Sequence, residues 1–131
     1  MKAILRSGFL AVAIMLVGAA YLGAPALSKE FDHEAICDAI HQSQAIHLWY
    51  KAGEDQRIVL PRFLGYTKVG NIILNGWQIS GFSRSGNLTG SRSFRLDRMT
   101  DMQFTNERVS GPKPSGRVPS GMVRMICRVV P

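Results

Sequence analysis

Acidic residues and cysteines are scarce in this sequence. Its 131 residues include 9 Asp and Glu against 16 Lys and Arg, which gives a formal net charge of +7, and there are only two cysteines. The length suits one domain and is too short for two. A positive charge of this size is compatible with an anionic ligand, nucleic acid or an acidic membrane surface, and equally with solubility alone.

The sequence also lacks the motifs of the common nucleophilic and metal-dependent enzymes. It contains no G-x-S-x-G and no H-E-x-x-H, and its glycines are scattered rather than gathered in a phosphate-binding loop. His33, Cys37 and His41 have a spacing that would suit zinc or copper on a helix, but no fourth ligand is evident nearby. We therefore expect no enzyme, no metal site and no cofactor.

No apolar run reaches the roughly 20 residues that span a bilayer comfortably. The longest begins at residue 9, follows two basic residues, and is succeeded by small-residue cleavage patterns that end at Ala26 and Ser28. This layout is typical of a secretory signal peptide, here residues 1–28. We expect cleavage after Ala26 or Ser28, a secreted or periplasmic protein, and no membrane span afterwards. An uncleaved N-terminal anchor is the alternative.

Export would place the two cysteines in an oxidising compartment, where thiols pair and stay paired. Cys37 and Cys127 lie near opposite ends of the expected mature chain. A bridge between them would close a loop of about 90 residues and contribute on the order of 4 kcal/mol in the chain-entropy account. We predict this disulfide. Two buried free thiols or an intermolecular pair are the alternatives.

The positive charge is concentrated in the C-terminal half. Without the two basic residues of the signal segment, 14 basic and 9 acidic residues remain, a net charge of +5. From Arg84 onward, nine basic residues stand against three acidic ones. Charge alone does not choose among an anionic ligand, nucleic acid, an acidic membrane surface and solubility.

Apolar periodicity predicts one short helix at the start of the mature chain. Residues 32–44 carry an apolar stripe at helical spacing, with Asp32 in position to cap the first turn. Residues 45–51 then alternate between apolar and polar side chains, which is the period of a strand. The apolar face of this strand consists of Ile46, Leu48 and Tyr50.

Further strands are expected over residues 57–68, 71–82, 92–98, 99–104 and 122–130. Pro61 has no backbone N–H, so it favours an edge or a bulge. Residues 110–121 are rich in Pro, Gly and Ser, which predicts a flexible or extended connection. One helix followed by five or six short strands is typical of a small β-barrel or sandwich.

Four segments resemble the WYL domain, which is found mostly as the sensor half of bacterial transcription regulators. In order, they are Ala39-Ile40 in the leading helix, "IHLWY" ending at Tyr50, "RIVLPRFL" beginning at Arg57, and "RSFRLDRM" beginning at Arg92. The resemblance covers roughly residues 34–104. The Trp-Tyr-Leu signature of the family appears here as Ile72-Ile73-Leu74, with Trp77 displaced beyond it.

The resemblance implies a mainly β fold, a small five- to six-stranded SH3-like or Sm-like barrel with one N-terminal helix. The WYL-like domain would occupy residues 32–108, followed by the connection and a C-terminal strand over residues 109–131. In relatives, a basic surface of the barrel takes up nucleotides, single-stranded nucleic acid or other anionic effectors. Transcriptional regulation does not follow, because an exported chain without a DNA-binding half is separated from the chromosome.

Three arginines cluster in the segment 92–98. In an extended strand, Arg95 shares a face with Asp97, which can partly neutralise it. Arg92 and Arg98 would share the apolar face of the same strand. An unpaired guanidinium is costly to bury, so these two must reach solvent at the barrel rim or meet an anion.

We therefore expect a non-catalytic binding module for an anionic ligand, with Tyr50 as a stacking surface. The expected ligand-binding residues are Tyr50, Arg57, Arg92, Arg95 and Arg98. Solvated rim arginines that bind nothing are one alternative. A second is an envelope protein-interaction or structural module, which exposed Trp49 or Trp77 would favour. A third is electrostatic attachment to an anionic membrane surface.

Overall fold

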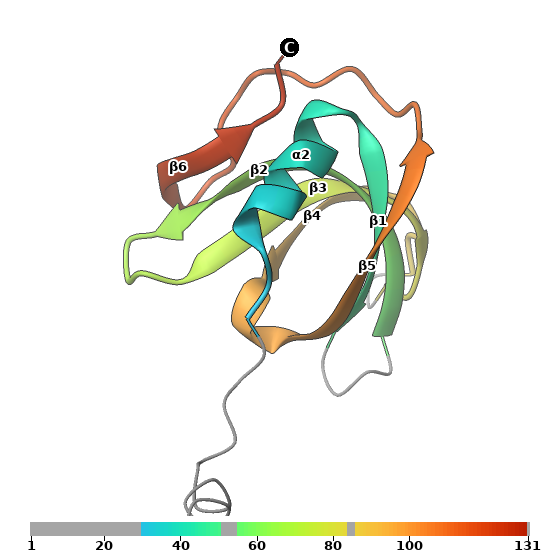
Figure 1. The fold of residues 1–131 in the computed structure, drawn as a ribbon, viewed down its shortest axis with the longest axis horizontal. Coiled ribbons are helices and arrows are strands. Elements are labelled where there is room, and N and C mark those ends of the chain that lie inside the picture. Colours follow the sequence, from blue (N-terminus) through green and yellow to red (C-terminus); the bar gives the residue numbers. More distant parts are fainter. Residues whose placement is uncertain (1–29, 51–54, 84–85, 131) are drawn as a thin grey trace, which may run out of the picture.

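The computed structural model describes residues 30–50, 55–83 and 86–130, so the expected signal peptide lies outside the described residues. The fold is mainly β: six antiparallel strands in one sheet with one helix packed on it (Figure 1). This confirms the predicted fold class and strand number. Within the described residues, no helix is long and apolar enough to cross a membrane.

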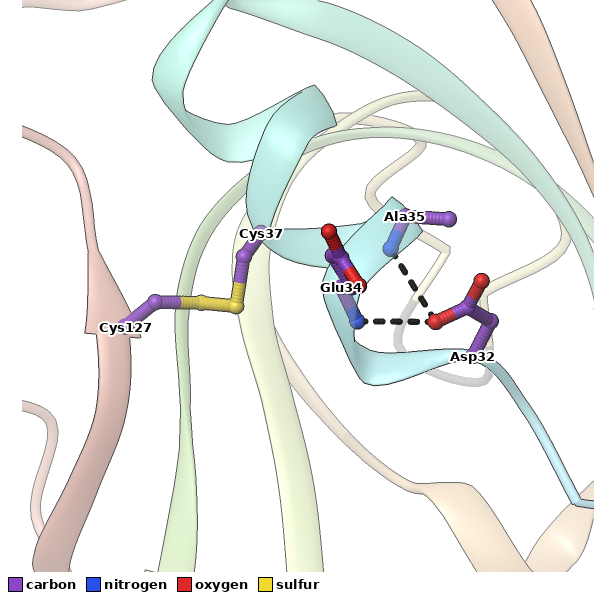
Figure 2. The surroundings of a disulfide bond; sticks show 5 residues. All are labelled: Asp32, Glu34, Ala35, Cys37 and Cys127. Carbon is purple, nitrogen blue, oxygen red and sulfur yellow. Dashed lines mark hydrogen bonds between the residues drawn. A yellow bond between two sulfur atoms is a disulfide. The ribbon is translucent and has the colours of Figure 1, made fainter.

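The helix α2 (His33–His41) begins at the predicted cap. Figure 2 shows the carboxylate of Asp32 accepting hydrogen bonds from the backbone N–H groups of Glu34, at 3.0 Å, and Ala35, at 3.4 Å. These contacts satisfy N–H groups that have no partner inside the helix. The helix ends before the predicted residue 44, because Ser43 adopts a positive φ of 54° and turns the chain into the first strand.

Five of the strands pair side by side in the order β4-β3-β2-β1-β5. Their bounds are β1 (Gln44–Tyr50), β2 (Asp55–Thr67), β3 (Ile72–Gly81), β4 (Gly90–Arg95) and β5 (Met99–Arg108). Among the described residues, no ladder of hydrogen bonds joins β4 to β5. The sheet is therefore not closed, and the expected barrel is not confirmed.

The strand β2 changes partner along its length. Its first half, up to Val59, pairs with β1, and its second half, from Phe63, pairs with β6 (Met122–Arg128). Its other edge pairs with β3, with a register shift between Pro61 and Phe63. Pro61 thus lies at a bulge and between two partners, where a missing N–H is tolerated, as predicted.

The main core lies between α2 and the face of the sheet that the helix covers. Alternation along β1 directs its predicted apolar face inward, and the paired strands supply the rest. The buried members are Ile36, Ala39, Ile40, Ile46, Leu48, Tyr50, Val59, Leu64, Leu74, Phe94, Leu96 and Met99. A smaller cluster of Phe63, Ile73 and Met122 joins β2, β3 and β6.

Residues 109–121 form an extended segment between β5 and β6, here called the strap. Two arginines hold it: Arg62 donates a hydrogen bond to the carbonyl of Pro112, and Arg128 donates one to the carbonyl of Gly116. The strap corresponds to the flexible or extended connection predicted from composition, and side chains of β2 and β6 hydrogen-bond to its backbone.

Cys37 and Cys127 form the predicted disulfide, with an S–S distance of 2.09 Å and a sequence separation of 90 residues (Figure 2). The bridge joins α2 to β6. Among the described strands, β6 pairs only with β2, along its second half. The disulfide therefore gives the last strand a second, covalent connection to the rest of the fold.

We predict that the double variant Cys37→Ser, Cys127→Ser loses about 4 kcal/mol of unfolding free energy, because the unfolded chain regains the freedom of a long loop. Urea unfolding of the oxidised wild type and the double variant, followed by tryptophan fluorescence, measures this loss. A loss of unfolding free energy below about 1 kcal/mol would show that the bridge adds little to a fold already held by the hydrogen bonds between β2 and β6.

Candidate functional site

The arginine-rich segment is divided by a turn. The strand β4 ends at Arg95, and a 3₁₀ turn, η1 (Leu96–Arg98), leads into β5. The predicted corner near Arg98 is confirmed. The placement of Arg98 on the apolar face of a strand is wrong, because the alternation stops at the turn: Leu96 is buried, whereas Arg98 is exposed.

Arg92 binds the loop that precedes its own strand. Its guanidinium donates to the carbonyl oxygens of Asn87 (2.9 Å), Ser91 (3.0 Å) and Thr89 (3.5 Å), and to the hydroxyl of Ser83 (3.4 Å). These acceptors replace water around the guanidinium. Arg92 therefore acts within the fold as a clamp on the loop between β3 and β4.

Arg95 is paired with Asp97, as the shared face predicted. The contact is bidentate, with Nε to Oδ1 at 3.0 Å and Nη2 to Oδ2 at 2.6 Å. Hydrogen bonding from Arg95, followed by its positive charge, holds the pKa of Asp97 below its usual value, and the same contact raises the pKa of Arg95. Asn71 Oδ1, at 3.4 Å, accepts a further bond. The charge of Arg95 is thus neutralised locally.

Arg57 lies almost buried among three aromatic rings. Its side chain is 11% exposed. The guanidinium carbon is 5.2 Å from the ring centre of Phe94, 5.6 Å from that of Tyr50 and 5.7 Å from that of Phe82. Contacts of this kind between a cation and aromatic rings are worth roughly 0.5–2 kcal/mol. The rings therefore hold the arginine in place without removing its charge.

The polar partners of Arg57 are few and distant. Nη2 lies 3.5 Å from the carboxylate of Asp55, and Nη1 lies 3.5 Å from Oε1 of Gln78. Nε is buried and has no hydrogen-bond partner in the described part of the chain. A buried donor without a partner costs roughly 1–3 kcal/mol. Arg57 is therefore a partly compensated charge inside the fold.

Gln78 connects Arg57 to the loop between β3 and β4. Its side chain is fully buried, and its Nε2 donates to the carbonyls of Phe82 (2.9 Å), Leu88 (3.3 Å) and Gly81 (3.4 Å). Gln78 was not among the residues predicted from the sequence. Its one signal was a polar side chain on the apolar face of a strand.

We predict that Gln78→Leu lowers the unfolding free energy by about 2–3 kcal/mol, because the backbone carbonyls of Gly81, Phe82 and Leu88 lose a side-chain donor inside the fold. Urea unfolding provides the measurement, and Gln103→Leu, an exposed glutamine on β5, is the matched control. Equal losses in both variants would mean that the network around Gln78 does not stabilise the fold.

Tyr50 is a core residue at the end of β1, 8% exposed. Its ring meets the edge of Phe94 at 5.5 Å, and its hydroxyl accepts a hydrogen bond from the backbone N–H of Arg95 at 3.3 Å. Together with Arg57, these contacts enclose the ring, so it is not an open stacking surface for a ligand.

The predicted site residues therefore separate into two groups. Tyr50, Arg57 and the backbone of Arg95 meet around Phe94, and Arg92 reaches the neighbouring loop. The Arg95 side chain and Arg98 do not join this group: one is held by Asp97, and the other is exposed on the 3₁₀ turn.

A cleft of about 580 Å³ opens beside the start of α2 and the turn between β2 and β3. Its charged lining is mainly acidic and consists of Glu30, Asp32, Glu34 and Asp97, with His33 beside them. An anion would be repelled from this cleft. No three His, Cys, Asp or Glu side chains within residues 30–50, 55–83 and 86–130 are placed to hold a metal ion. Because Cys37 is in a disulfide, it has no thiolate to join His33 and His41 as a metal ligand.

Comparisons with models of protein families, with curated proteins and with solved structures find no match to this chain. The resemblance to the WYL domain consequently stays a prediction from four sequence segments. The function must be inferred from the chemistry of the residues described above.

Proposed function

We propose that the chain is an exported, non-catalytic binding module of the WYL type with an SH3-like or Sm-like barrel. The strand order supports a barrel, because neighbouring strands are antiparallel, β5 lies beside β1, and a short 3₁₀ turn links β5 to β4. The signal-like residues 1–28 support export. The disulfide agrees with export, because such bonds persist in oxidising compartments.

We further propose that this module binds an anionic ligand at Arg57. The ligand is a nucleotide, a single-stranded nucleic acid or another acidic molecule. The incomplete compensation of Arg57 is the observation that supports this. Its carboxylate partner, Asp55, stands at 3.5 Å, beyond the roughly 2.7–2.9 Å of a charge-assisted hydrogen bond. An incoming anion would supply closer acceptors and would compete with Asp55 for the same guanidinium.

We predict that Asp55→Asn tightens the binding of nucleotides or short single-stranded oligonucleotides about tenfold, because a partly buried competing carboxylate is removed. Titration at low and at moderate salt provides the measurement, and binding should weaken as salt rises.

The matched control is Glu107→Gln, which changes the net charge equally on an exposed part of β5. Equal tightening in both variants would assign the effect to general charge rather than to Arg57. Absence of binding in the wild type and in Asp55→Asn at low salt would contradict the anionic ligand.

The second candidate function is a protein-interaction module, and the loop between β3 and β4 favours it. Phe82 is 46% and Leu88 is 61% exposed, and Gln78 and Arg92 hold the loop through hydrogen bonds to its backbone. Large apolar side chains that are exposed next to such hydrogen-bonded backbone are suited to contact another protein. The two tryptophans expected to mark such a surface are only partly exposed.

If this second function holds, Leu88→Ser abolishes the retention of a specific envelope protein on the immobilised chain. Val69→Ser, which replaces an 81% exposed valine on a different loop, should leave retention intact. Mass spectrometry of the retained proteins provides the comparison. Retention that both substitutions reduce alike, or neither reduces, would contradict a role for this loop.

A further inference from the structure

A hollow of about 190 Å³ lies between the strap and the sheet. It combines side chains from β2 and β4 with side chains from the strap, and its lining contains no acidic residue. Its polar members are chiefly guanidinium and hydroxyl groups, from Arg62, Ser91, Ser115, Arg117 and Ser120.

The surroundings of the hollow are strongly basic. Residues 109–130, which form the strap, β6 and the two residues after β6, contain four basic residues and no Asp or Glu. Arg128 lies over the ring of Phe63, a wall of the hollow, at 5.2 Å. The ion pairs described for this fold, Arg57 with Asp55 and Arg95 with Asp97, involve no residue of this region. Charges of one sign around a concave surface raise the local concentration of counter-ions.

Arg62 is partly buried in this wall. Burial lowers its pKa, because loss of water penalises the charged form. Its described hydrogen bond goes to the carbonyl of Pro112, and no carboxylate pairs with it in the described parts of the chain. An anion in the hollow would supply the missing negative charge.

We propose that this hollow binds a phosphoryl group, held by Arg62 and Arg117 and by the serine hydroxyls. Two guanidinium groups and three hydroxyls offer more donors than a planar carboxylate has lone pairs to accept, whereas a tetrahedral oxyanion uses several at once. Ser115 Oγ already accepts a bond from the backbone N–H of Arg117 at 3.2 Å, which leaves its own O–H to donate.

The size of the hollow limits the ligand. A volume of about 190 Å³ is below the roughly 300–1,000 Å³ of sites that enclose a drug-sized molecule. The hollow therefore takes the phosphoryl group itself, either as inorganic phosphate or as the headgroup phosphate of an anionic lipid. The bound group would bridge the strap to β2 and β4, and it is separate from the ligand proposed at Arg57.

The test uses the purified, disulfide-bonded protein and two probes. Inorganic phosphate is titrated calorimetrically at low ionic strength, and flotation is measured with vesicles of phosphatidylglycerol and, for comparison, phosphatidylcholine. We expect saturable binding to phosphate or to phosphatidylglycerol vesicles, weakened at least about tenfold by Arg117→Gln. Lys113→Gln is the matched control, because it removes the same charge from the same strap at a residue that does not line the hollow.

The two probes distinguish free phosphate from a lipid headgroup. Binding to either probe supports the site if Arg117→Gln weakens that binding and Lys113→Gln does not. No binding to either probe, or equal loss in Lys113→Gln, overturns it. Thermal unfolding without phosphate checks that Arg117→Gln is folded like the wild type, as expected for an exposed side chain. Loss of binding in Arg117→Gln tests the hollow, and tighter nucleotide binding in Asp55→Asn tests the Arg57 proposal, so failure here and failure of the Arg57 proposal are separate outcomes.

Discussion

The fold depends on the exchange of partners along β2. Its first half is hydrogen-bonded to β1 and its second half to β6, and Pro61 stands between the two, where no N–H is available for a ladder. β5 ends beside the start of β1 and β6 begins beside the end of β2, and the chain between them runs past Leu60 and Arg62 of β2. That passage is the strap. The disulfide fixes the far end of β6, at Cys127, to α2.

Local chemistry accounts for what the sequence predicted correctly. The cap at Asp32, the alternation of β1 and the bulge at Pro61 each follow from neighbouring residues alone. The end of β5 does not, because the strand continues through polar residues to Arg108 instead of stopping at Phe104. Its backbone pairs with β1 whatever its side chains are, and the hydroxyl of Thr105 donates to a β1 carbonyl at 2.7 Å.

The arginines show why the site was harder to predict than the fold. Arg95 and Asp97 are neighbours on one face, so their ion pair could be derived from spacing. The partners of Arg92 are mostly backbone carbonyls of a loop. Every residue has a backbone carbonyl, so the residue types in the sequence could not indicate these contacts. The rings around Arg57 come from β1, β4 and the residue after β3, and Gln78 reaches it from β3. Only the assembled sheet brings these groups together.

The same assembly separates the charges of the molecule. Acidic side chains line the cleft at the start of α2, whereas the strap and β6 carry basic side chains without an acid of their own. Anions are therefore drawn toward the strap and repelled from the cleft. The two proposed anion sites differ in how far their arginines are exposed to water. Arg57 is a largely buried charge with the carboxylate of Asp55 beside it, so its ligand must compete with Asp55 for the guanidinium. Arg117 is exposed on the strap, so attraction to it is screened by salt, and only the partly buried Arg62 gives that site a component that salt does not remove.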